Sequence, residues 1–489
     1  MAATRDPNTL QHKLRWLLGL LGLVVVALVV AAMAWCPQQP VYHGPVRHVV
    51  VISLDTTRAD HFGCYGNTWI RTPRIDALAD EAVLFADYMT VVPTTLASHV
   101  SLFTGKYPHT HGVPRNGFVV HADNVMLAEI LKEADFHTAG FLASFALDKR
   151  FNFAQGFDYF DQEFDILANG REIDQNQRRA QAVTDAVIAY LDREGVPPNL
   201  FLFVHYFDSH MPYDPPPPYD TMYGEAKGAI KLGDHPALLG GYRPRQLRQF
   251  LCRHAGEVSY MDQHVGRLLD DLKRRGILDQ ALLVVTSDHG ENLGDEASHL
   301  FDHGWTTYQS VMHAVGVIRL PGAAHGGTRL DLPVASIDIL PTVLNYLELP
   351  TPTGVDGQVI DLTNPRQTTM SRTRFGEATK PWDEVETDPR WLNNRKARCV
   401  REGPFKYIYT SYRGSEELYD LSSDPHERRN LLASRTPELA RRAAGLRRKL
   451  DAWTATQKPL PSHFDRGQRE ETIRRLKALG YLSTDDDGD

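Results

Sequence analysis

Long apolar runs alternate with amphipathic stretches between residue 48 and about residue 347. Four runs of branched and aromatic residues predict strands buried on both faces: 48–54, 138–142, 200–205 and 281–286. Five stretches with apolar residues at helical spacing predict helices: 75–85, 127–135, 180–193, 257–275 and 337–347. Strands that alternate with helices predict an α/β fold, with a mostly parallel sheet flanked by helices.

The pattern changes beyond about residue 350, where turn-rich, proline-containing segments begin. Short antiparallel strands are predicted at 398–409 and 417–421, followed by an amphipathic helix at 437–457 and a tail helix at 468–482. A chain of 489 residues also exceeds what one hydrophobic core usually organises. We therefore expect a catalytic domain at 47–350 and a smaller C-terminal subdomain of sheet and helix, with its tail, at 351–489.

An uncharged apolar run from Trp16 to Trp35 is long enough to span a bilayer. Three basic residues precede it, and the next basic residue after it is Arg47. This asymmetry predicts a cytoplasmic segment at 1–15, a single signal anchor at 16–35 and a linker at 36–46. The remainder is then extracytoplasmic, either periplasmic or extracellular. A signal-peptidase site at 32–34 is the alternative, but the apolar run is longer than a usual signal peptide's.

Charge and cysteine content exclude several classes of protein. The formal charge is −8 and the sequence contains no long run of Lys and Arg, so a nucleic-acid partner is not expected. The four cysteines lack the paired spacing of a zinc knuckle or a disulfide framework.

Acidic and imidazole groups follow two of the predicted strands directly. Asp55 follows the strand at 48–54, and Asp288 with His289 follows the strand at 281–286. The carboxyl ends of parallel strands lie at one edge of a sheet, where ligands bind, so these groups should converge. Two carboxylates and an imidazole form a site for a divalent metal ion of hard or borderline character.

The stretch 91–106 predicts a loop that delivers Thr94 and Thr95 to a helix N-terminus, which favours an anion. An isolated threonine pair of this kind is most often only a helix cap. Beside a metal site, however, Thr95 is a candidate ligand and nucleophile, because metal binding lowers the pKa of water by roughly nine units and an alcohol should respond similarly.

Several histidines and one lysine are candidates to contact the substrate. His210 and His303 are predicted to bind the oxygens of the transferred group or to protonate the leaving group. Four further residues are predicted to bind an anionic substrate: His99, Lys106, His111 and His205.

These motifs together resemble the sulfatase family of the alkaline phosphatase superfamily. The stretches that carry the resemblance lie between residues 47 and 433: 53–60 with 63–66 and 287–291 for the metal, 95–106 for the nucleophile, and 338–342, 356–357 and 418–425 in the C-terminal part. The resemblance implies an alkaline-phosphatase-like fold and metal-dependent hydrolysis of ester bonds.

Three departures from the family pattern bear on the chemistry. Thr95 stands where sulfatases carry the cysteine or serine that becomes formylglycine, and threonine cannot be converted in this way. Thr56 replaces a second aspartate after Asp55, and the family's Lys/His pair is absent. The pattern instead resembles phospho-transferring relatives, in which a metal-bound threonine forms a covalent intermediate. The reduced number of carboxylates favours manganese or zinc as the single divalent ion, with calcium and magnesium as alternatives.

We therefore expect a membrane-anchored metallo-esterase that hydrolyses phosphate mono- or diesters or sulfate esters, with Thr95 as nucleophile. Its substrate would be an anionic ester, carried by a glycan or a lipid. Three alternatives remain: transfer of a phospho-head-group to an acceptor alcohol, sulfate ester hydrolysis proper, and non-catalytic binding of anionic glycans or lipids.

Overall fold

The larger of two sheets has eight strands among the described residues, in the order β4-β3-β5-β1-β6-β7-β2-β8. Their bounds are β1 His48–Leu54, β2 Val83–Met89, β3 His137–Phe141, β4 Tyr159–Asp161, β5 Leu200–Tyr206, β6 Ala281–Thr286, β7 Gly316–Arg319 and β8 Thr328–Ala335. β7 pairs antiparallel with both β6 and β2, and the other neighbours pair in parallel. β1, β5 and β6 are buried at every position, as their continuous apolar runs predict.

This computed structural model describes residues 46–164, 176–224, 244–295, 303–364, 372–380, 395–434, 436–465, 469–479 and 481. The predicted anchor at 16–35 lies outside these ranges. In the part of the chain that is described, no helix has both the length and the apolar character needed to cross a bilayer.

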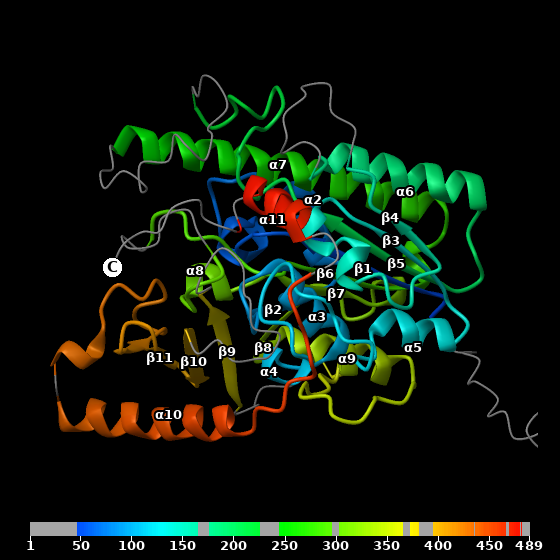
Figure 1. Ribbon diagram of the computed structural model, residues 1–489. Coiled ribbons are helices and arrows are strands. Elements are labelled where there is room, and N and C mark those ends of the chain that lie inside the picture. The colour runs from blue at the N-terminus through cyan, green and yellow to red at the C-terminus, as the bar shows by residue number, and fades with distance from the viewer. Residues whose placement is uncertain are drawn as a thin grey trace, which may run out of the picture. The chain divides into compact units, whose positions relative to one another are not determined.

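Helices cover both faces of the larger sheet (Figure 1). The α-helices are α2 Pro73–Asp80, α3 Thr95–Thr104, α4 Pro108–His111, α5 Leu127–Glu133, α6 Ala180–Glu194, α7 Pro244–Arg274, α8 Gln309–Met312, α9 Ile339–Tyr346, α10 Pro437–Ala455 and α11 Arg469–Ala478. Short 3₁₀ helices are η1 Ala59–His61, η2 Gly63–Tyr65, η3 Phe145–Leu147, η4 Lys149–Phe151, η8 Leu278–Gln280, η9 Pro321–Ala323, η10 Ser336–Asp338 and η11 Leu431–Ser434. On one face α7 packs against α2 and α6, and on the other α3 packs against α5 and α9.

The smaller sheet is antiparallel, in the order β12-β11-β10-β9. Its strands are β9 Thr373–Thr379, β10 Lys396–Glu402, β11 Phe405–Thr410 and β12 Ser415–Asp420. α10 packs against β10 and β11, and its Trp453 ring stacks on Phe375 of β9 at a centroid distance of 4.9 Å. The mostly parallel larger sheet flanked by helices, together with the separate antiparallel sheet, confirms the predicted α/β fold class.

An apolar cluster and one backbone bond join the two sheets near the loop before α3. Met89 at the end of β2 packs with Met312, Cys399 and Ile408. The Glu377 N–H of β9 donates to the Val91 carbonyl at 3.0 Å. The smaller sheet therefore supports the chain just before the Thr94–Thr95 pair.

The helix predicted at 75–85 is wrong in its second half. α2 ends at Asp80, and the residues from Val83 onward form β2, buried at most positions between β7 and β8. Pairing with two neighbouring strands outweighs the helical spacing of the apolar residues. The predicted helix at 257–275 is the C-terminal part of α7, which begins earlier, at Pro244.

Candidate active site

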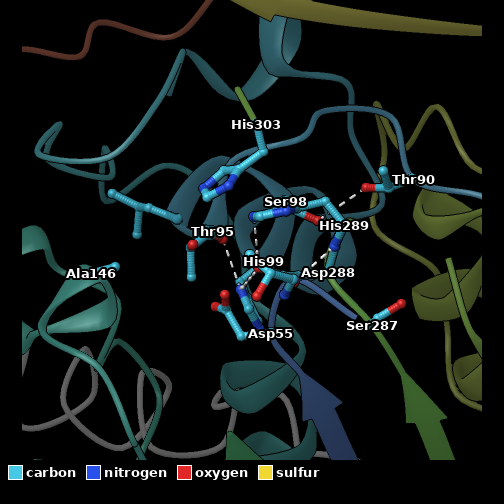
Figure 2. Close-up of polar contacts among 12 residues, drawn as sticks. Asp55, Thr90, Thr95, Ser98, His99, Ala146, Ser287, Asp288, His289 and His303 are labelled. Carbon is cyan, nitrogen blue, oxygen red and sulfur yellow. Dashed lines mark hydrogen bonds and ion pairs between the residues drawn. The ribbon is translucent and has the colours of Figure 1, made fainter. Parts of the chain in front are cut away.

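Two adjacent strands, β1 and β6, deliver three of the predicted metal ligands to one edge of the larger sheet. β1 lies between β5 and β6, and Ser53 is in register with both His205 and Thr286. Asp55 follows β1, while Asp288 and His289 follow β6, so all three side chains lie at the same edge. One ligand atom from each of the three lies within 4.8 Å of the others, and all three residues are buried. Figure 2 shows them grouped beside Thr95.

One polar atom of each of these side chains has a hydrogen bond and the other has none, although two of these second atoms, His289 Nε2 and Asp288 Oδ2, lie 3.3 Å apart. His205 Nε2 lies 2.9 Å from Asp55 Oδ2, the Thr56 N–H donates to Asp288 Oδ1 at 3.1 Å, and His289 Nδ1 lies 2.9 Å from the Gly290 carbonyl oxygen. The remaining atoms, Asp55 Oδ1, Asp288 Oδ2 and His289 Nε2, are buried without a hydrogen-bond partner. Two carboxylate oxygens and an imidazole nitrogen held in this way suit a divalent cation.

The electrostatics of the cluster also suit a cation. Burial raises the pKa of Asp55, and burial together with the charge of Asp55 raises that of Asp288. Burial lowers the pKa of His289 to about 4, so that its imidazole is neutral at physiological pH, the form that binds metal ions. A divalent cation would offset the cost of burying two carboxylates side by side.

Thr95 is the first residue of α3, as the sequence predicts. Thr94 is the N-cap in an extended conformation, and the helix ends at Gly105 with φ of 66°. Thr95 is fully buried, and its hydroxyl lies close enough to Asp55 to influence the pKa of that carboxyl. At the first turn of α3, the Leu96 N–H donates to Asn116 Oδ1 at 2.7 Å.

Thr56 has a backbone conformation that is unusual for a β-branched residue. Its φ is 48°, in the left-handed region, and its side-chain oxygen is buried without a partner. Such strain is typical of functional sites. Here it allows the Thr56 N–H to point at Asp288 across the sheet edge.

His210 and His303 lie together beside this cluster. Their ring centroids are 5.2 Å apart, and the His303 ring is 4.5 Å from that of His289. His210 Nδ1 lies 2.7 Å from the Met211 carbonyl oxygen, and its Nε2 is buried and unpaired. His303 Nδ1 lies 3.2 Å from the Glu291 carboxylate. The structure thus brings both predicted catalytic histidines to the site.

The predicted substrate-binding residues lie elsewhere or have other partners. His99 bonds the Thr95 carbonyl and the Ser53 hydroxyl, at 2.7 and 2.8 Å. His111 bonds the Ser101 hydroxyl and the Val113 N–H, at 2.9 and 3.1 Å. Both ring nitrogens of each histidine are hydrogen-bonded inside the fold, which favours a structural role for these two residues.

Lys106 lies away from the cluster, whereas His205 lies within it. Lys106 lies beyond the far end of α3, roughly 15 Å from Thr95 at the rise of an α-helix. His205 holds the Asp55 carboxylate and is itself fully buried. His205 therefore lies where it can position Asp55, a predicted metal ligand.

Tyr481 is a site residue that the sequence did not reveal. Its hydroxyl lies 2.9 Å from the Thr95 hydroxyl, 386 positions earlier in the chain. Its ring centroid lies 5.1 Å from that of His210 and 5.8 Å from that of His303. No local pattern marks this tyrosine, because its contact with the site arises only from the tertiary fold.

Comparison with known proteins identifies a family. The family model described as "Sulfatase" matches residues 47–349. The arylsulfatase of Clostridium perfringens (strain 13 / Type A) is 25% identical over 459 residues, which cover 79% of this chain and 90% of that protein.

Solved structures share the fold. A phosphonate monoester hydrolase from Silicibacter pomeroyi aligns with a TM-score of 0.67 and 23% identity, covering 84% of this chain and 96% of that one. A protein in complex with its substrate D-glucosamine-2-N,6-O-disulfate aligns with a TM-score of 0.68 and 19% identity, covering 84% of this chain and 98% of that one.

Proposed function

This chain belongs to the sulfatase family of ester hydrolases, and on that premise we propose that it hydrolyses phosphate mono- or diesters with the Thr95 hydroxyl as nucleophile. One observation carries the proposal. Thr95 is the first residue of α3, and beside it lie three buried atoms that could bind a metal ion and that have no hydrogen-bond partner. Threonine cannot supply the aldehyde hydrate used by formylglycine sulfatases, so the hydroxyl itself is the available nucleophile.

Asp55, Asp288 and His289 would hold a divalent cation, with Thr95 as a further ligand. When bound, the cation supplies positive charge that acidifies a coordinated hydroxyl and neutralises oxygens of the ester. We favour manganese or zinc, because the donor set contains an imidazole and Thr56 takes the place of a further carboxylate.

The two histidines at the site have different hydrogen-bonding capacities. The Met211 carbonyl oxygen can only accept, so the His210 Nδ1 carries hydrogen and its Nε2 can accept a proton. His303 Nδ1 lies 3.2 Å from the carboxyl group of Glu291, whose pKa burial raises to about 8, so this pair can hold a proton near neutral pH. We assign His210 to receive the hydroxyl proton of Thr95, and His303 to protonate the departing alcohol.

In the proposed reaction, the Thr95 oxygen bonds to phosphorus as the bond from phosphorus to the ester oxygen breaks. The alcohol leaves with the proton from His303. Water then attacks phosphorus as the bond from phosphorus to the Thr95 oxygen breaks; His303 takes a proton from the water and His210 returns its proton to Thr95. The product is phosphate, or a phosphomonoester where the substrate is a diester. An acceptor alcohol in place of water would make the same site a transferase.

The test is a panel of aryl phosphates, phosphodiesters and aryl sulfates, with the full-length chain and several divalent ions. Thr95→Ala should lower kcat/KM for the preferred ester by at least about a thousandfold, whereas Thr95→Ser should retain part of the activity. Acid quenching during turnover should trap phosphate on the peptide that contains Thr95. Full activity of Thr95→Ala would exclude this mechanism.

A second candidate is hydrolysis of sulfate esters by the same hydroxyl. The arylsulfatase among the relatives supports it. Sulfate release from an aryl sulfate at a rate above that of phosphate release would favour this candidate. Inclusion of an acceptor alcohol in the same assay distinguishes hydrolysis from transfer.

We also propose that residues 16–35 anchor the protein in a membrane, with the catalytic domain outside the cytoplasm. The support is the charge asymmetry around this uncharged run. An ester on an extracytoplasmic glycan or lipid would then be within reach. Retention in the membrane fraction after alkaline extraction, and digestion of the catalytic domain by protease added outside, would test the anchor and its orientation.

A further inference from the structure

The C-terminal segment that carries Tyr481 is packed firmly onto the catalytic domain. Leu476 and Leu479 are buried, and the Arg475 guanidinium lies 3.9 Å from the centre of the Phe145 ring. Thr472 donates to the Asp465 carboxylate at 2.7 Å. The Tyr481 N–H donates to the Leu476 carbonyl at 3.0 Å, so the backbone of the tyrosine is tied to α11 and moves with it.

The Tyr481 hydroxyl occupies space that a substrate needs. Its oxygen is 2.9 Å from the Thr95 oxygen, whereas an attacked phosphorus or sulfur atom must lie about 3 to 3.5 Å from that same oxygen. The tyrosine ring lies beside His210 and His303, the side from which the transferred group would be bound. An ester that reaches Thr95 from the side of His210 and His303 would therefore meet the tyrosine hydroxyl.

We propose that Tyr481 is an intramolecular competitor of the substrate: its hydroxyl binds the nucleophile in the resting enzyme and withdraws when an ester enters. The inference rests on the proposed function of Thr95. Tyr481 lies well outside the region matched by the family model, residues 47–349. The competition would thus be supplied by this chain's own C-terminal segment.

Steady-state kinetics of the full-length chain test the competition. Tyr481→Ala should lower KM for para-nitrophenyl phosphate, or for the preferred ester of the panel, by about five- to tenfold, with kcat unchanged or higher. Tyr481→Phe loses only the hydroxyl and its hydrogen bond, so a decrease of about threefold in KM is expected. Glu470→Ala, an exposed change on the same helix, should alter neither constant.

Two outcomes would overturn the inference. A fall in kcat in both tyrosine variants would show that the phenol assists the reaction, and an unchanged KM would show that it does not compete. If Tyr481→Ala does not fold, Tyr481→Phe alone still decides between these results. Turnover by the wild-type chain tests the proposed function separately, since it requires no effect of position 481.

Hydrogen exchange provides a measurement that does not depend on turnover. Inorganic phosphate is added with the divalent ion until calorimetry shows saturation. Amides of α11 and of Tyr481 should then exchange faster than in the phosphate-free protein, because the segment is displaced. Unchanged exchange in this segment at saturation would refute displacement, whatever the catalytic activity of the chain.

Discussion

The ion pair between the two sheets allows a quantitative test of how the fold supports the site. Arg374 of β9 is 1% exposed and donates to the two carboxylate oxygens of Asp87 on β2, at 3.0 and 2.7 Å. Arg401 of β10 donates to the same carboxylate at 2.6 Å. Asp87→Asn leaves two largely buried guanidinium groups without their anion.

The expected cost follows from burial. Loss of one partner of a buried pair typically costs about 3–5 kcal/mol. The Asp87 side chain is 23% exposed, so water can partly replace it, and the lower end of this range, about 3 kcal/mol, is expected. At roughly 2.1 cal/mol/K of unfolding entropy per residue, a compact unit of about 450 residues would lose about 3 °C in Tm.

Thermal unfolding followed by circular dichroism measures the change. Asp331→Asn is the matched control, because Asp331 pairs with Arg329 at an exposed site where both side chains are more than half exposed. This control should alter the free energy of unfolding by about 0.5 kcal/mol or less. Equal Tm values for Asp87→Asn and wild type would refute the assignment of this pair as a link between the sheets.

The pH dependence gives the same prediction a second, independent check. Burial alone would raise the pKa of Asp87, but Arg374 and Arg401 outweigh that effect and hold it below its usual value. The stabilisation is therefore complete above the pKa of an unfolded aspartate, about 3.9, and is lost as the pH falls through the lower pKa of the folded state. The difference in Tm between wild type and Asp87→Asn should shrink in that acid range. A difference that stays constant there would contradict the reasoning.

Three further changes test the site and its surroundings. His205→Phe removes the hydrogen bond to the carboxylate of Asp55, a proposed metal ligand. Titration should then show about 10- to 100-fold weaker metal binding with an unchanged circular dichroism spectrum, and unchanged affinity would exclude a positioning role. A divalent ion at a hundred times its Kd should raise the free energy of unfolding of the wild type by about 2.7 kcal/mol and have little effect on that of Asp288→Asn. Equal stabilisation of both proteins would show that the ion binds elsewhere. Gly112→Ala should lower Tm more than Gly66→Ala. Both glycines have positive φ, but only at Gly112 would a Cβ lie 2.0 Å from a neighbouring atom, the Leu460 carbonyl oxygen.

The central strands could be predicted from the sequence because burial on both faces requires continuous apolar runs. β1, β5 and β6 satisfy this requirement, and their order in the sheet then brings Asp55 and Asp288 together. The short edge strand β4 has three half-buried residues and no distinguishing pattern. β2 was hidden because its apolar residues directly continue those of α2, so only the neighbouring strands reveal its conformation.

Contacts between distant segments set the limit on predicting the site. The helix α3 has a local signal, with Thr94 as its cap, Thr95 as its first residue and a glycine after it. Tyr481 has none, since its contact with Thr95 depends on the packing of α11 against the 3₁₀ helix at Phe145–Leu147. The strain at Thr56 is equally invisible, because a threonine in sequence carries no sign of positive φ.

The roles of the histidines depend on which ring nitrogen lacks a partner. In His99 both ring nitrogens bond groups inside the fold, which accounts for its burial without any ligand. In His289 and His210 one nitrogen bonds a backbone carbonyl, and the other is buried without a hydrogen-bond partner, although that of His289 lies 3.3 Å from Asp288 Oδ2. Such a nitrogen costs about 1–3 kcal/mol in the folded state. The cost is offset only when a ligand arrives, so these two histidines, unlike His99, hold a nitrogen ready for the cation or the reacting proton.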